Sequence, residues 1–222
     1  MTEQIRADFD RLARFDEDEW NHNNHYHSFL LKHLPADCAE ALEIGSGTGA
    51  FSRMLAERCG HVLGLDLAPE MVRLARERSA EFSNLNYQVA DVLELEFPRE
   101  KYGCIASIAT FHHLPLEKML AKTKEALQPG GVLLVIDLFQ SEWPQEMLTD
   151  LIAVPASALL KLVKTGRLRD SAEVRAAWEA HGAHDVYQPL SVIRAACAKI
   201  LPEAGVRRHW LWRYSIVWQK PR

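Results

Sequence analysis

The sequence has no apolar run long enough to span a membrane, and its N-terminus is acidic and amphipathic, unlike a secretory signal. Its four cysteines are scattered without a CxxC pair, which argues against a disulfide framework or a cysteine-based zinc site. The net charge is −4, so the chain offers no broad basic surface for nucleic acid. We therefore expect a cytoplasmic protein with neither a membrane nor a nucleic acid as its partner.

The composition is that of an ordinary globular protein. Of the 222 residues, 48% are hydrophobic and 25% are charged, which suits one α/β domain. Continuously apolar stretches alternate with segments of helical periodicity, and this pattern predicts a doubly wound parallel sheet covered by helices on both faces. The strands are expected at 40–44, 61–65, 85–90, 104–109 and 132–136, with a turn at 129–131 before the fifth.

Further segments extend this alternation. Residues 206–210 and 214–218 are too close in sequence for a parallel crossover, so they should pair as an antiparallel hairpin and complete a mostly parallel seven-stranded sheet. Residues 141–181 indicate two helical segments, the first interrupted at Pro155, and another helix is expected at 190–201. We divide the single domain, 1–222, into an N-terminal helical lid at 1–34, a core at 36–137, a helical cap at 141–201 and a terminal hairpin at 205–219.

The chain is organised around the stretch Glu43-Ile44-Gly45-Ser46-Gly47-Thr48-Gly49, where an apolar strand pattern changes into alternate glycines and then into a helical pattern. Glycine adopts positive φ angles and lets a ligand approach the backbone, and the new helix directs unpaired N–H groups into the same space. The stretch predicts a site for an anionic or strongly polar ligand. A dinucleotide is one candidate, because Gly45-x-Gly47-x-x-Ala50 fits the GxGxxG/A fingerprint, and another nucleoside cofactor is the alternative.

Two further acids follow expected strands, Asp66 after the second and Asp91 after the third. Ligands of open α/β sheets bind outside these carboxyl ends. A carboxylate accepts two hydrogen bonds side by side, so Asp66 is expected to hold a ribose diol, and this suits either kind of cofactor. Asp91 separates the two, because a carboxylate there can accept from an adenine amino group and has no counterpart in the dinucleotide fingerprint.

In these features the chain resembles the class I S-adenosylmethionine-dependent methyltransferases. The similarity rests on Glu43-x-Gly45-x-Gly47-x-Gly49, the two acids, the stretches 108–114 and 127–131, and the terminal hairpin. It implies S-adenosylmethionine as cofactor and a small-molecule methyl acceptor. By this resemblance the loop and Ala109 would face the methionine moiety, Asp66 the ribose, and Asp91 with Val92 the adenine. The implied cofactor-binding residues are Glu43, Gly45, Ser46, Gly47, Gly49, Asp66, Leu67, Asp91, Val92 and Ala109.

His112 and His113 are the candidate catalytic residues. They follow the fourth expected strand at the ligand-binding end and titrate near neutrality, so either could act as a base, or else pack or contact the cofactor.

The segment 20–27 is rich in histidine and asparagine. His22, His25 and His27 suggest a metal site, but no cysteine or acid is spaced to complete it, and we predict no metal. We expect instead that the segment faces the ligands as part of the lid and excludes water, with His25 and Tyr26 contacting the cofactor.

Two rival functions stay open at this point. One is an NAD(P)-dependent oxidoreductase built on the GxGxxA pattern of the loop. The other is a non-catalytic module that binds the cofactor and serves in an interaction. The intact set of loop glycines and strand-end acids weighs against a decayed site.

Overall fold

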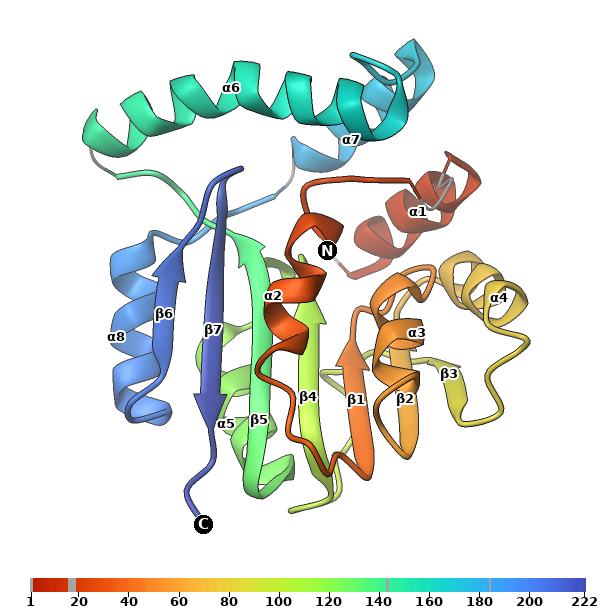
Figure 1. Cartoon of the computed structure of the whole chain (residues 1–222), viewed down its shortest axis with the longest axis vertical. Helices are drawn as coiled ribbons and strands as arrows, with labels where there is room; N and C mark the ends of the chain where they lie inside the picture. Colours follow the sequence, from red (N-terminus) through yellow and green to blue (C-terminus); the bar gives the residue numbers. More distant parts are fainter. Residues whose placement is uncertain (1, 16–18, 143, 184) are drawn as a thin grey trace.

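A computed structural model describes residues 2–15, 19–142, 144–183 and 185–222. A seven-stranded sheet with the order β3-β2-β1-β4-β5-β7-β6 forms its centre (Figure 1). Strands β1 to β5 run parallel, whereas β7 lies antiparallel to β5 and β6. The predicted fold class is therefore confirmed. The strands are β1 (Glu40–Ile44), β2 (His61–Asp66), β3 (Leu85–Val89), β4 (Tyr102–Ile108), β5 (Leu127–Leu138), β6 (Gly205–Arg208) and β7 (Arg213–Gln219).

The strand order determines where a ligand can bind. β1 pairs with β2 on one side and with β4 on the other. The chain therefore builds the sheet outward from β1 first in one direction and then in the other. Such a reversal opens a crevice outside the carboxyl ends of the strands. Leu42 and Ile44 of β1 and Ile105 of β4 are fully buried, as expected for parallel strands covered on both faces.

Helices cover the two faces of the sheet (Figure 1). On one face α5 (Leu116–Ala126) and α8 (Leu190–Ile200) bury Leu120 and Ile193 against the strands. On the other face α2 (His27–Leu31), α3 (Ala50–Ala56) and α4 (Pro69–Arg78) bury Leu30, Leu55 and Val72. Both cores hold the strands rigidly, so the residues at their ends have fixed positions.

A cap lies beyond the carboxyl ends of the parallel strands (Figure 1). It consists of α1 (Thr2–Leu12), α6 (Pro144–Thr165) and α7 (Ala172–Gly182), with the short 3-10 segments η1 (Ala13–Phe15) and η2 (Asn24–Tyr26). Leu12 of α1 packs with Met71 of α4 and Ala177 of α7 and joins the cap to the core. None of the helices in the described ranges is long and apolar enough to cross a membrane.

Two predicted details of secondary structure are wrong. α6 continues through Pro155: the proline has no N–H to donate to the carbonyl one turn earlier, but the helix is maintained on both sides of it. Residues 129–131 form no separate turn but an irregularity inside β5, where the register with β4 shifts. Gly130 has a φ of 81° there, and its N–H donates to the Lys220 carbonyl at 2.8 Å, so the terminal chain orders this stretch.

Candidate functional site

The glycine-rich loop joins β1 to α3. Its three glycines have φ angles of 72°, 53° and 83°, in the left-handed region that favours glycine. The N–H groups of Gly45 and Ser46 donate to the Leu65 carbonyl of β2 at 2.8 and 2.9 Å. A Cβ on Gly45 would lie 1.9 Å from Thr110 Oγ1, whereas a Cβ on Gly47 would meet nothing within 4 Å. The loop is therefore tightly packed at Gly45 and open at Gly47.

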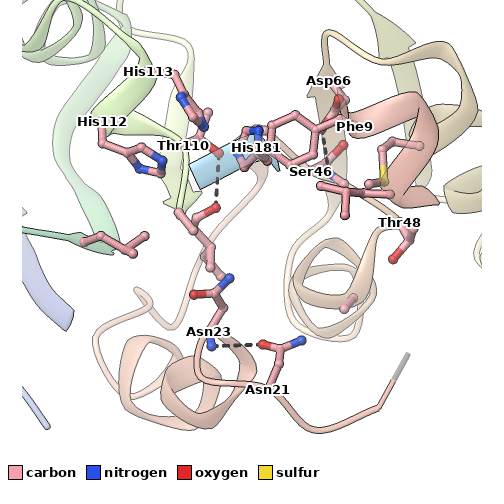
Figure 2. A pocket seen from close by; sticks show the side chains of 18 of the residues that line it. Phe9, Asn21, Asn23, Ser46, Thr48, Asp66, Thr110, His112, His113 and His181 are labelled. Atoms are coloured by element: carbon pink, nitrogen blue, oxygen red, sulfur yellow. Dashed lines mark hydrogen bonds between the residues drawn. The ribbon is translucent and has the colours of Figure 1, made fainter. Parts of the chain in front are cut away.

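A cavity of about 800 Å³ lies between this loop and the cap, outside the carboxyl ends of the strands (Figure 2). The residues predicted from the sequence that line it are Glu43, Gly45, Ser46, Gly47, Asp66, Leu67, Asp91, Val92, Ala109, His112 and His113. The fold brings these residues together because each lies at or just after the carboxyl end of a parallel strand.

Three predicted cofactor contacts lie outside the lining of this cavity. A Cβ on Gly49 would come within 2.1 Å of the Tyr87 hydroxyl, so Gly49 permits close packing behind the loop. His25 is exposed, and Tyr26 is buried with its hydroxyl donating to the Trp210 carbonyl. The 3-10 turn at 24–26 directs these two side chains away from the cavity. The lid segment lines it instead with Trp20, Asn21, His22, Asn23, Asn24 and His27.

Glu43 is a buried acid on β1 beneath the loop. It is 2% exposed and accepts a hydrogen bond from the Ser52 hydroxyl. Burial raises the pKa of Glu43 to about 8, the hydrogen bond from Ser52 opposes that rise, and the nearby Asp66 carboxylate adds to it. The carboxyl group is therefore able to change its charge near neutral pH.

Asp66 links β2 to the loop. Its Oδ2 accepts from the Gly47 N–H at 2.8 Å and its Oδ1 from the Ala68 N–H at 2.9 Å. Burial raises the pKa of Asp66, and these backbone hydrogen bonds oppose the rise. Each carboxylate oxygen offers about two acceptor sites, so both can still accept from a ligand.

Asp91 and Ala109 complete the strand-end wall. Asp91 comes two residues after β3, and its Oδ1 accepts from the Leu93 N–H at 2.8 Å. Ala109 has a φ of 50°, an unusual value for a residue with a Cβ, and its N–H donates to the Ile136 carbonyl at 2.7 Å. This bend carries the chain after β4 along the cavity toward His112.

Ser46 Oγ on the loop and Trp20 Nε1 on the lid are buried in the cavity wall without a hydrogen-bond partner. Buried polar groups normally have partners, so these atoms indicate a polar ligand between loop and lid. A nucleoside with an amino-acid chain offers both donors and acceptors there. Together with the open space at Gly47 and the remaining acceptor sites of Asp66, the residues fit S-adenosylmethionine.

A second set of polar residues lies around His112, in a part of the cavity wall away from Ser46 and Trp20. His112 lies in η3 (Phe111–His113), and its Nδ1 is 2.6 Å from Asp137 Oδ1. Asp137 is fully buried at the end of β5, and its Oδ2 accepts from the His112 backbone N–H at 2.8 Å. The two bonds fix the ring, so that Nε2 is the nitrogen left for other partners.

His113 and Asp185 lie beside this pair, and Figure 2 shows the two adjacent histidines on one wall. Burial lowers the pKa of His113 to about 4, and the neighbouring His112 contributes. Asp185 Oδ1 is 3.5 Å from His113 Nδ1, and Asp185 Oδ2 is 3.6 Å from His181 Nε2 and accepts from the Tyr187 hydroxyl at 2.8 Å.

The sequence analysis missed Asp137, Asp185, His181 and Tyr187 as site residues. Asp137 had a usable signal, since it ends a strand in the same way as Asp66 does. The other three belong to the cap or to the chain after it, where helical periodicity says nothing of which side chains reach the sheet. Only the folding of α7 over the strand ends brings them to His112 and His113.

Comparisons with known proteins agree with this geometry. Residues 41–131 match the family model described as a methyltransferase domain. A demethylmenaquinone methyltransferase of Tropheryma whipplei (strain Twist) is 28% identical over 143 residues, which cover 61% of this chain and 59% of that protein. A phosphoethanolamine N-methyltransferase of Plasmodium falciparum (isolate 3D7) is 32% identical over 115 residues, 49% of this chain and 43% of that protein. The chain thus spans about half the length of these curated relatives.

One solved structure covers nearly the whole chain. The N-methyltransferase NodS from Bradyrhizobium japonicum WM9, in complex with S-adenosylhomocysteine, aligns with a TM-score of 0.66 over 98% of this chain and 99% of that chain. The sequence identity is 17%, so the likeness concerns the fold.

Proposed function

This chain belongs to the class I S-adenosylmethionine-dependent methyltransferases, and on that premise we propose that it transfers a methyl group from S-adenosylmethionine to a small-molecule acceptor. The observation that carries the proposal is the cavity at the strand ends, with its open face at Gly47 and the unpartnered Ser46 Oγ. When bound, S-adenosylmethionine supplies a methyl group already activated on a sulfonium.

The chain's own residues bind and orient the two reactants. Asp66 accepts hydrogen bonds from the ribose hydroxyls while the N–H groups of Gly47 and Ala68 hold its carboxylate in place. Asp91 and Val92 flank the adenine, and the loop from Gly45 to Gly47 contacts the methionine portion. Glu43 lies below the loop, and a cation bound above it would favour the ionised form of this buried carboxyl group.

The enclosure of the cavity favours a small acceptor over a macromolecule. The lid segment and α7 both line it, and His22 Nε2 lies 2.6 Å from Ser157 Oγ on α6, so lid and cap meet over the site. Such closure excludes water from the reacting groups. We place the group that is methylated next to His112 and His113, which Asp137 and Asp185 accompany.

The test is a transfer assay with S-adenosylmethionine that carries a labelled methyl group. The acceptor panel includes hydroquinones, primary amines, carboxylates and a structured RNA, and S-adenosylhomocysteine is measured as the second product. We expect label in one small-molecule class, and none with the Gly47→Ala variant. Label in RNA alone would refute the small-molecule acceptor, and NADH-dependent reduction without methyl transfer would refute the reaction.

The state of the cysteines supports a location in the reducing cytoplasm, which suits this function. All four cysteines are buried free thiols, which is the state expected of a protein of the cytoplasm.

A further inference from the structure

We propose that His112, His113 and Asp185 bind a divalent transition-metal ion such as Zn²⁺ in the wall of the cavity. This departs from the sequence-based expectation of no metal, which concerned the histidines at 22, 25 and 27. Of those, His22 is bonded to Ser157 and His25 is exposed, so they do not converge. The residues that do converge come from η3 and from the chain after α7.

The distances suit a metal better than direct ion pairs. Asp185 Oδ1 lies 3.5 Å from His113 Nδ1, and Asp185 Oδ2 lies 3.9 Å from His112 Nε2. The three residues can offer ligand atoms that all lie within 4.8 Å of one another. Metal–ligand bonds of about 2.0–2.1 Å place tetrahedral ligand atoms roughly 3.3 Å apart. The separations of 3.5 and 3.9 Å are longer than this and involve the two different oxygens of Asp185, so side-chain shifts of about half an ångström or more would have to draw the ligand atoms, now within 4.8 Å of one another, around one ion.

Two of the ligands are held by further protein groups. Asp137 bonds His112 Nδ1 at 2.6 Å, which leaves Nε2 for the ion and forms the carboxylate–histidine–metal arrangement common in metal sites. The Tyr187 hydroxyl orients the Asp185 carboxylate at 2.8 Å. Asp137 and Asp185 together bring two negative charges, of which Arg213 in the same cavity wall offsets one. The site therefore attracts a cation.

His113 provides a second, independent observation. Its side chain is 8% exposed, yet its Nε2 has no hydrogen-bond partner, and its Nδ1 is too far from Asp185 for a well-formed hydrogen bond. Hydrogen bonding within the described part of the chain does not explain why this imidazole is buried here. A metal ion between Nδ1 and Asp185 would replace this long contact, and the Nε2–H would remain for a bound ligand to accept.

An ion with three protein ligands keeps a position for a substrate, and all three ligands line the cavity. An acceptor hydroxyl that binds the ion would release its proton to water as it enters, before the cavity closes, while the electron pair stays on oxygen, because the ion stabilises the resulting oxyanion. This role rests on the proposed methyl transfer, whereas ion binding itself does not. His112 and His113 would then act as ligands and not as bases.

The experiment uses the full chain freed of metal by a chelator and dialysed. Zn²⁺ is titrated calorimetrically, and Co²⁺ is added separately because its visible absorption reports coordination by nitrogen and oxygen. We expect one ion per chain in the wild type. Asp137→Asn should weaken binding by about 10–100-fold, since it removes only the partner of a ligand. Asp185→Asn and His113→Gln should weaken it further, and His25→Gln, a histidine outside the cavity, serves as the matched control.

Three results would overturn the metal site: no stoichiometric ion in the wild type, equal affinity in Asp185→Asn and wild type, or an equal loss in His25→Gln. Circular dichroism of each variant verifies folding, and His113→Gln replaces Asp185→Asn if the latter unfolds. S-adenosylhomocysteine is titrated into the metal-free protein in parallel. If S-adenosylhomocysteine binds the metal-free protein while no ion binds the wild type, the metal site is refuted and the methyltransferase function still stands.

Discussion

The ionisation of Glu43 allows a quantitative test of the electrostatics under the glycine loop. The perturbation is Glu43→Gln, which keeps the side-chain shape and an acceptor for the Ser52 hydroxyl but cannot ionise. In the wild type, burial raises the pKa of this carboxyl from 4.5 to about 8. The variant should therefore lose one specific pH dependence of stability and retain all the others.

The sign of the effect follows from proton binding. Between about pH 4.5 and 8 the unfolded chain has released the Glu43 proton while the folded protein still holds it, so the wild type becomes less stable as pH rises. The shift corresponds to roughly 5 kcal/mol at most. The free energy of unfolding of the wild type, relative to that of Glu43→Gln, should thus fall by several kcal/mol across this window and level off above it.

Urea unfolding of the ligand-free proteins at a series of pH values measures this difference directly. Glu40→Gln, on the same strand but partly exposed beside Lys101, is the control for removing an acid from β1. A wild-type-minus-Glu43→Gln difference that stays constant with pH would show that Glu43 is ionised throughout, and the electrostatic reasoning would be refuted.

The remaining predictions concern the loop, the ribose site and the lid. Gly47→Ala should lower stability by about 1–2 kcal/mol because of its backbone angle, and should weaken the binding of S-adenosylhomocysteine at least about tenfold by filling the open space. Gly45→Ala should be more destabilising, because its Cβ clashes with Thr110. Urea unfolding measures the loss of stability and calorimetry the loss of binding. Asp66→Ala should reduce cofactor affinity by at least about tenfold in calorimetry and also lower the Tm, because the N–H groups of Gly47 and Ala68 lose their acceptor; unchanged affinity would remove Asp66 from the ribose site. Residues 20–24 should gain protection from amide exchange when S-adenosylhomocysteine binds, and equal exchange with and without it would show that this segment is no lid.

The sheet and the loop were predictable because their signals are local. The alternation of apolar strands and helices predicted a parallel sheet, though not the order of its strands, and the three glycines predicted the turn after β1. Asp66 and Asp91 could be placed because the carboxyl ends of parallel strands meet at one edge.

The cap was not predictable to the same degree, because its residues reach the site through tertiary packing. His25 was expected in the cavity, but one 3-10 turn directs it outward and leaves His22 inward. Asp185 and His181 gave no periodic signal of function. The continuity of α6 through Pro155 was not predictable either, because a proline costs a helix one backbone hydrogen bond and local sequence does not show that the helix tolerates this cost.

The most direct test of the central claim is calorimetric titration of the full chain with S-adenosylhomocysteine and, separately, with NADH. We predict that one S-adenosylhomocysteine binds per chain, that Gly47→Ala abolishes or strongly weakens this binding without unfolding the protein, and that NADH does not bind. Tight NADH binding without S-adenosylhomocysteine binding, or equal S-adenosylhomocysteine affinity in wild type and Gly47→Ala, would contradict the assignment of the cavity.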